Sequence, residues 1–347
     1  MAVEESQTVS VIIPVYGRFK SLVHTVESIL AQTHPVREII LIDDGSIDET
    51  PEALPRYLAG QPSWRERVRY FYQENQGQSA ALNHGISKAT GEWLAFDGSD
   101  DLWLPWKLEW QFRALAKFSQ CALCFADAWF MNNPGEKKTL FQLGGNLGQG
   151  TLGMVQHPAR LIVNHTVVWA QTILVRASLV CQVGGFDPVL RWSEDRDFLF
   201  RAALATDFCY VGMPMALIDR SPCEVKHYGE AENWHRAEYT TRLEQYRIEK
   251  QQRLADELPP DVRMAIRRNL RDVHCSWAKA HLEKGDVRSA RQSLRTAMAC
   301  APDWKTAAKW SLAWLAPALA KRMVVARRRR VGPRPDLGDW QVSPKYV

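Results

Sequence analysis

Short apolar runs alternate with amphipathic stretches along the first half of this chain, and no other feature constrains the fold as strongly. Apolar runs lie at 9–13, 38–42, 68–72, 92–96 and 121–126. Helical patterns are expected at 19–32, from about 46 to 59, at 79–90 and at 103–118. Strands that alternate with helices form βαβ units around a mostly parallel sheet. The sequence therefore predicts an α/β fold with helices flanking the sheet.

The character of the chain changes near residue 228, where the strand patterns stop. Helical patterns follow at 231–257, 261–284 and 287–299. The segment 278–302 is similar to one tetratricopeptide unit, but a single unit cannot stack alone, so we expect a helical hairpin within this region. We expect three parts: an α/β domain over 1–227, a helical accessory region over 228–320 and a basic tail over 321–347.

Charge is concentrated at the C-terminal end. The net charge is +5, and residues 321–347 carry eight Lys or Arg against two Asp, so the rest of the chain is close to neutral. A neutral body argues against a nucleic-acid-binding surface. No apolar run reaches the ~18–20 residues of a membrane span, and seven scattered cysteines suit a reducing compartment. We therefore expect a cytoplasmic protein without a nucleic-acid partner.

An apolar stretch at 310–325 leads directly into four consecutive arginines at 327–330. Two interpretations are open. The stretch could lie on the surface of an anionic membrane, at the inner face of the plasma membrane, where basic residues favour binding. Alternatively, it could be a helix packed on the first domain and followed by a disordered basic end.

Polar residues follow four of the predicted strands. They are found at 16–18, 43–46, 75–79 and 97–101. In an open parallel sheet, ligands bind beyond the carboxyl ends of the strands, so these residues should share one edge. Three Asp within 97–101 repel one another unless a cation or solvent intervenes. A divalent ion that holds a diphosphate would suit such an edge. A P-loop is absent, and the G-x-G-x-x-G at 148–153 lacks the context of a dinucleotide site.

Several ordered motifs carry a family resemblance. They are 11–16 (VIIPVY), 28–33 (SILAQT), 43–46 (DDGS), 75–77 (NQG) with 81–85 (ALNHG), 91–93 (GEW), 99–101 (SDD), 184–187 (GGFD), and 194–195 (ED) with Arg201 behind. Over residues 8–225 the chain resembles the family 2 glycosyltransferases, which have the GT-A fold. The resemblance implies transfer of a sugar, with inversion, from a nucleotide-diphosphate sugar to an acceptor hydroxyl in glycan or cell-surface polysaccharide synthesis. The expected donor is a UDP-sugar, and the expected acceptor is a glycan or lipid-linked.

The resemblance also assigns roles to residues. Asp195 would be the general base, with Glu194 beside it. Independently of the resemblance, Trp192 lies two residues before Glu194 and is a candidate for stacking on the acceptor sugar. A divalent ion, Mn²⁺ or Mg²⁺, would be held by Asp97, Asp100 and Asp101. The nucleotide sugar would contact Pro14, Val15, Tyr16, Arg18, Asp44, Gln78, Asp97, Ser99 and Asp100.

One position departs from the family pattern. Aligned from Gly91, the first Asp of the D-x-D motif falls on Gly98, one residue after Asp97. A one-residue slip in a strand turns the side chain to the other face. Either Asp97 supplies the carboxylate, or Asp100 and Asp101 act alone. The departure motivates a non-catalytic nucleotide- or glycan-binding protein as the alternative. A sugar-phosphate nucleotidyltransferase is less favoured, because no Gly-rich phosphate loop follows the first strand.

Overall fold

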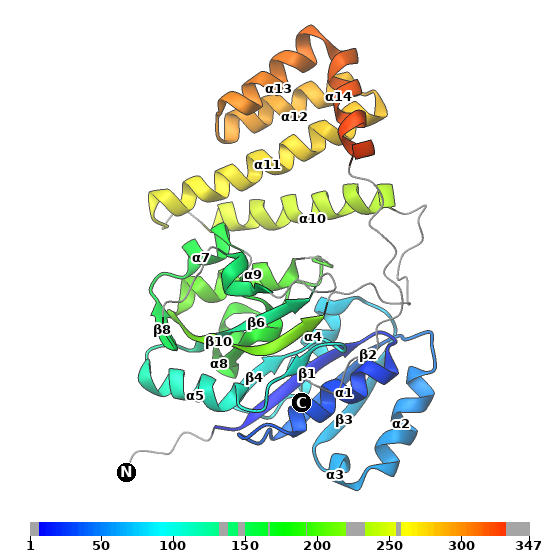
Figure 1. Cartoon of the computed structure of the whole chain (residues 1–347), viewed down its shortest axis with the longest axis vertical. Helices are drawn as coiled ribbons and strands as arrows, with labels where there is room; N and C mark the ends of the chain where they lie inside the picture. Colours follow the sequence, from blue (N-terminus) through cyan, green and yellow to red (C-terminus); the bar gives the residue numbers. More distant parts are fainter. Residues whose placement is uncertain are drawn as a thin grey trace. The chain divides into compact units, whose positions relative to one another are not determined.

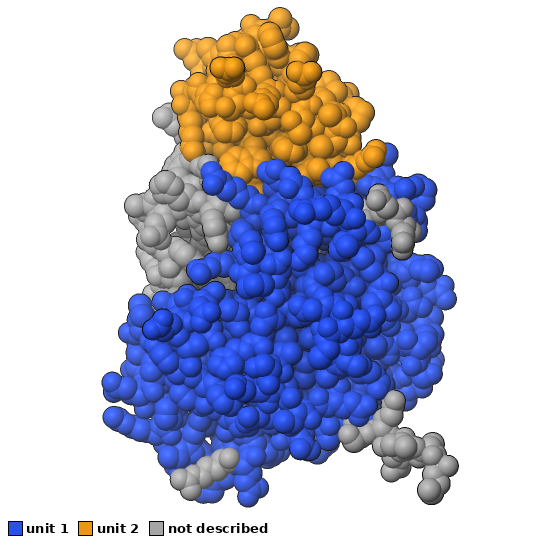
Figure 2. Space-filling model, turned by 180° about the vertical axis from the view of Figure 1, so that it is seen from behind, with its two compact units in different colours: residues 1–221, 242–266 blue, residues 222–241, 267–347 orange. Residues whose placement is uncertain are grey.

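The computed structural model describes residues 7–131, 138–144, 150–165, 167–191, 193–219, 233–254 and 258–330. The chain forms two compact units (Figure 2): unit 1 comprises Met1–Ser221 and Arg242–Ile266, and unit 2 comprises Pro222–Thr241 and Arg267–Val347. The boundary we expect at residue 227 lies outside the described residues. None of the described helices combines the length and apolar character that crossing a membrane requires.

The N-terminal half of unit 1 is a parallel sheet. Its strands lie in the order β3-β2-β1-β4, and each pairs in parallel with its neighbour. They are β1 (Val9–Val15), β2 (Glu38–Asp44), β3 (Val68–Gln73) and β4 (Trp93–Phe96). Every residue of β2 and β4 is buried, as expected where helices cover both faces of a sheet. The predicted βαβ arrangement is confirmed.

Helices connect these strands and cover the sheet (Figure 1). They are α1 (Phe19–Leu30), α2 (Thr50–Gly60), α3 (Pro62–Arg65) and α4 (Gln78–Lys88). In α1, Leu22, Val26 and Ile29 recur at helical spacing and are completely buried. Helix α4 packs on β1 and β2 and follows Gly77, whose φ of 91° favours glycine. Helix α1 starts a few residues after the carboxyl end of β1, and α4 starts a few residues after the carboxyl end of β3.

The second half of the sheet is mixed. Its path continues from β4 through β9 (Ile173–Arg176), β6 (Leu123–Met131) and β10 (Phe208–Asp219) to β5 (Leu102–Trp103). Among the described strands of this half, β6 and β10 pair in parallel. Strand β7 (Lys138–Thr139) pairs antiparallel with β6, and β8 (Leu152–Val155) pairs antiparallel with β10. The remaining elements are α5 (Lys107–Lys117), α6 (Leu140–Leu143), α7 (Ala159–Asn164), η1 (Ala170–Thr172), α8 (Ala177–Val183) and α9 (Glu194–Ala205).

The helix expected over 103–118 begins later than predicted, so this expectation is wrong at its N-terminal end. Trp103 lies in β5 and pairs with Ala216, and the helix α5 starts at Lys107. The reason is Pro105, which disfavours helical backbone at the preceding residue. The regular spacing of tryptophans at 103, 106 and 110 therefore does not mark one helix face.

Unit 2 is helical. Helices α10 (Asn233–Arg253) and α11 (Pro260–Lys284) each run through residues of both units, while α12 (Val287–Cys300), α13 (Trp304–Leu315) and α14 (Pro317–Arg330) lie within unit 2. Alanine and leucine side chains form its core, with Ala278, Leu294 and Ala313 in one cluster and Leu282, Ala290 and Ala320 in another. The tetratricopeptide-like hairpin and the domain limits stay predictions.

Candidate active site

The loops that follow β1 and β2 are locked together by hydrogen bonds. Gly17 N donates to Ser46 Oγ at 2.7 Å, and Arg18 N donates to Asp48 Oδ2 at 3.1 Å. Gly17 has a φ of +70°, and a Cβ there would lie 3.0 Å from Asp48 Oδ2. Glycine is needed because it allows both this backbone conformation and this close approach. The predicted residues Pro14 and Tyr16, both partly buried, and the buried Val15 lead into this junction.

Asp44 joins the end of β2 to the loop after β3. Its Oδ1 accepts hydrogen bonds from Gln73 Nε2 and Gln76 N, and its Oδ2 accepts one from Gly77 N, all at 2.8 Å. The side chain is buried, so these three bonds use most of its acceptor capacity. Asp44 therefore shapes the 73–77 loop, and its contact with a nucleotide stays a prediction.

An ion pair connects the ends of β1 and β4. Arg18 Nη1 donates to Asp100 Oδ2, across 82 positions of sequence, and both side chains are about one quarter exposed. Thr25 in α1 donates to the carbonyl oxygen of Asp101 at 2.8 Å. Ser99, which directly precedes Asp100 in the sequence, is also buried. The structure thus brings Arg18, Ser99 and Asp100 to one edge of the sheet, as the sequence predicts for strand ends.

The carboxylates of Asp100 and Asp101 converge on Gly98. A Cβ at Gly98 would lie 2.6 Å from Asp101 Oδ2 and 3.1 Å from Asp100 Oδ1. Proteins bind Mg²⁺ through one or two carboxylates together with substrate phosphates, and this pair fits that description. Within the described ranges, no group of three or more His, Cys, Asp or Glu is arranged to hold a metal by itself. A divalent ion here would therefore need oxygen ligands from a bound diphosphate.

Asp97 has different surroundings from Asp100, because its side chain is buried and feels both Asp101 and Lys107. Its side chain is buried, and burial raises its pKa well above the ordinary value; the charge of Asp101 adds to this effect, and Lys107 opposes it. Lys107 in α5 is itself completely buried and lies 3.8 Å from the centre of the Trp103 ring. Its Nζ donates to Gln111 Oε1 at 3.1 Å. A buried positive charge thus acts on Asp97 from within the protein, and the role of Asp97 in metal or ribose binding stays a prediction.

The candidate base lies at the start of α9. Glu194 is 8% exposed, and burial, followed by the charge of Asp195, raises its pKa to about 7. Burial also raises the pKa of Asp195, whose Oδ1 accepts a hydrogen bond from Arg196 N at 2.8 Å. Carboxyl groups that titrate near neutral pH are suited to proton transfer. The electrostatics of this acidic pair therefore favour acid–base chemistry.

Contacts along α4 bring the approach to α9 next to the end of β3. Asn83 and Phe186 exchange two hydrogen bonds of 2.7 and 2.9 Å. Ser79 Oγ donates to Leu190 O, and a Cβ at Gly77 would lie 3.4 Å from Arg191. The exposed Gln78 begins α4 at this place. Trp192, the predicted acceptor residue, lies outside the described residues.

Helix α10 holds α9 through charged side chains that the sequence reasoning missed. Glu244 accepts from Arg196 at 3.4 Å and also pairs with Arg247, whose side chain is 1% exposed. Lys250 donates to Asp187 at 2.7 Å and to Asp197 at 3.1 Å. A signal existed in the sequence: Leu243, Arg247 and Gln251 are spaced by four residues, and all three are buried. Such polar residues on an apolar helix face indicate a polar partner.

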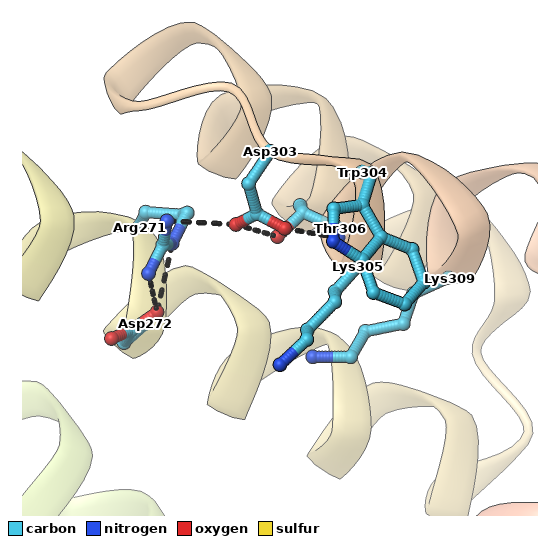
Figure 3. Close-up of a pocket in the computed structure, with 7 residues that line it drawn as sticks. All are labelled: Arg271, Asp272, Asp303, Trp304, Lys305, Thr306 and Lys309. Atoms are coloured by element: carbon cyan, nitrogen blue, oxygen red, sulfur yellow. Dashed lines mark hydrogen bonds and ion pairs between the residues drawn. The ribbon is translucent and has the colours of Figure 1, made fainter.

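A separate cavity of about 310 Å³ lies in unit 2 (Figure 3). It is lined by Arg271, Asp272, Asp303, Trp304, Lys305, Thr306 and Lys309. None of the residues predicted for donor, metal or base lines it. The strand-end edge of unit 1 therefore remains the candidate active site.

The sequence is similar to those of known glycosyltransferases. Residues 10–168 match the sequence model of a family described as Glycosyl transferase family 2. The uncharacterized glycosyltransferase RT0329 of Rickettsia typhi is 29% identical over 197 residues, which are 56% of this chain and 58% of the relative. The putative teichuronic acid biosynthesis glycosyltransferase TuaG of Bacillus subtilis is 38% identical over 128 residues, 37% of this chain and 49% of TuaG. The matched segments span less than two thirds of these curated relatives.

Solved structures show the same fold. The crystal structure of S. aureus TarS 1–349 in complex with UDP-GlcNAc aligns with a TM-score of 0.62 over 96% of this chain and 95% of that chain, at 17% sequence identity. This likeness confirms the expected fold class, an α/β sheet flanked by helices and followed by a helical region. Residues 10–168 therefore match glycosyl transferase family 2, and the chain has the GT-A type of fold.

Proposed function

We propose that this protein is an inverting glycosyltransferase that uses a nucleotide-diphosphate sugar, specifically a UDP-sugar, as its donor. The observation that carries the proposal is the set of contacts joining the ends of β1, β2, β3 and β4 to the segment before Glu194 and Asp195. The complex of the structurally similar TarS with UDP-GlcNAc supports the donor class. Donor and base would then lie on one edge of the sheet.

The proposed reaction is a single displacement. The acceptor hydroxyl attacks the anomeric carbon, its oxygen forms the new glycosidic bond, and the bond between that carbon and the diphosphate oxygen breaks. The acceptor proton passes to Asp195, and the diphosphate leaves with the electron pair. A positioned base contributes roughly 10²–10⁴-fold to such a step. Burial raises the pKa of Asp195, which favours proton uptake.

A divalent cation, Mn²⁺ or Mg²⁺, belongs to the proposal. Asp100 and Asp101 would hold it together with the diphosphate, since both carboxylates face the space beside Gly98. When bound, it would stabilise the charge of the leaving diphosphate. Arg18, which pairs with Asp100, would hold one of these carboxylates in place and add positive charge at the same edge.

We place the reaction in glycan or cell-surface polysaccharide synthesis, with a glycan or lipid-linked acceptor. The name of TuaG, a relative over 37% of this chain, supports this pathway class. A lipid-linked acceptor is held at a membrane, so we propose that the protein works in the cytoplasm at the inner face of the plasma membrane. Neither proposal involves nucleic acid.

The first test measures thermal unfolding with UDP, GDP and TDP, each with and without Mn²⁺ or Mg²⁺. A ligand at about 100 times its dissociation constant stabilises by about 2.7 kcal/mol. We expect stabilisation by UDP that requires the metal. No stabilisation by any nucleotide would favour the alternative, a non-catalytic glycan-binding or interaction protein, for which the glycine at position 98 is the supporting observation.

The second test is Asp195→Asn, assayed by release of UDP from a UDP-sugar in the presence of acceptor glycans. The turnover rate should fall by at least roughly 10²-fold, because the amide cannot accept the proton. Nucleotide-dependent stabilisation should persist, which separates loss of the base from loss of the fold. An unchanged rate would refute the assignment of Asp195.

A further inference from the structure

Helices α13 and α14 expose large apolar side chains. Leu319 and Met323 are 50% and 57% exposed, and because they are four residues apart in α14 they lie on the same face of that helix. Leu315, the last residue of α13, is 86% exposed. Large apolar side chains that gather in an exposed patch mark an interaction site more often than scattered ones do. These three side chains therefore favour contact with a partner.

The inner face of the same helices is already used. Leu312 and Val324 pack against the core cluster formed by Leu282, Ala290 and Ala320. The apolar stretch of 310–325 is thus divided into an inward set that completes unit 2 and an outward set that does not. Folding of the unit accounts for the first set alone.

Helix α13 also carries exposed tryptophans. Trp304, Trp310 and Trp314 are all exposed, by 75%, 37% and 52%. The guanidinium of Arg291 lies 4.4 Å from the centre of the Trp314 ring and donates to the Trp314 carbonyl oxygen at 3.1 Å. This ring is therefore held in an exposed position by its neighbour. Tryptophan is enriched where proteins meet the head-group region of a bilayer, because its ring is amphipathic.

Basic residues occur in the same two helices as these apolar side chains. Lys305 and Lys309 extend side by side next to the ring of Trp304 (Figure 3). Lys321 and Arg322 are exposed on α14, and the helix continues through four arginines at 327–330. The sign of this charge is what anionic head groups attract. A second copy of this chain is disfavoured as the partner, because it would bring these cations against one another.

We propose that α13 and α14 form a docking surface for an anionic lipid bilayer. Leu315, Leu319 and Met323 enter the head-group region, and Lys321 and Arg322 contact lipid phosphates. Apolar side chains combined with basic residues favour binding at the surface of an anionic bilayer. The inference deepens the proposed membrane location and does not depend on the transfer chemistry.

The test is co-sedimentation of the full chain with vesicles of phosphatidylcholine alone or of phosphatidylcholine mixed with phosphatidylglycerol. We expect sedimentation with the anionic vesicles only, weakened by added salt. Combined Leu315→Gln, Leu319→Gln and Met323→Gln should weaken binding at least tenfold. Because these side chains are exposed, thermal unfolding of the variant should match that of the unaltered protein.

Met264→Gln is the matched control, since this methionine is also exposed on a helix, by 42%, but lies in unit 1; it should bind vesicles normally. A full chain that stays in the supernatant, or that binds both vesicle types equally, overturns the inference. Loss of self-association in the triple variant without any vesicle binding would also overturn it. UDP-sugar turnover with a soluble acceptor should be unchanged in the triple variant, so failure of docking and failure of the proposed activity give different results.

Discussion

Replacing Glu194 with glutamine should stabilise the folded protein, and the gain should grow with pH. Burial raises the pKa of this carboxyl from 4.5 to about 7. Between these two values the folded state binds more protons at this site than the unfolded state. Stability therefore falls as the pH rises through this window. Glutamine carries no charge at any pH and removes the cost.

The size of the gain follows from the same shift. The ionised Glu194 costs about 1 kcal/mol at pH 5 and about 3 kcal/mol at pH 8, relative to a carboxyl whose pKa does not change on folding. Urea unfolding of Glu194→Gln and of the unaltered protein at both pH values measures the difference. The gain from the substitution should be about 2 kcal/mol larger at pH 8.

A matched control separates this effect from a general response to pH. Glu52 also lies in the first turn of a helix, but its side chain is 82% exposed. Glu52→Gln should change stability by less than about 0.5 kcal/mol at either pH. Equal gains from Glu194→Gln at pH 5 and pH 8 would refute the reasoning. So would a loss of stability at pH 8.

Three further outcomes are expected. Gly98→Asp should destabilise the metal-free protein by about 1–3 kcal/mol in urea unfolding, because its Cβ would lie 2.6 Å from Asp101 Oδ2; Mn²⁺ should restore part of the loss, and full stability without metal would contradict the geometry. Gly85→Ala should also destabilise by about 1–3 kcal/mol despite the helix preference for alanine, since its Cβ would lie 2.3 Å from Ile12; a gain in stability would show that the helix moves freely. Arg247→Gln should shift the acidic limb of the kcat/KM profile to higher pH, because the positive charge of the arginine lowers the pKa of the candidate base; an unchanged limb would exclude this influence.

The alternation of strands and helices, and the polar residues at the strand ends, can be predicted because each depends on a short stretch of sequence. The polar residues after four strands could be placed on one edge from the alternation of strands and helices alone, and Arg18 and Asp100 do meet there. The start of α5 was mispredicted although its cause, Pro105, is also local. In that case the regular spacing of tryptophans suggested a helix that the proline prevents.

Long-range electrostatic partners could not be read from the sequence. Nothing in the sequence around Asp97 identifies Lys107 as the buried positive charge near it, because that proximity depends on how α5 packs against β6 and β10. Likewise, Glu244 pairs with Arg196 and Lys250 pairs with Asp197, each about fifty residues away in sequence, and only the packing of α10 on α9 brings them together. The direction of a carboxylate in a site depends on such contacts.

The division of the chain into units has a consequence for how this protein can be cut or recombined. Residues 242–266 belong to unit 1 although a stretch of unit 2 precedes them. A fragment that ends at residue 221 would leave Asp187 and Asp197 without the ammonium group of Lys250. Asp197 would keep Arg201 as a partner, but Asp187 would lose its ion pair with Lys250, and both losses should destabilise the fragment. Limited proteolysis or exchange of the helical region with that of a relative should therefore succeed only when the break lies after residue 266, so α10 is inherited with the catalytic half.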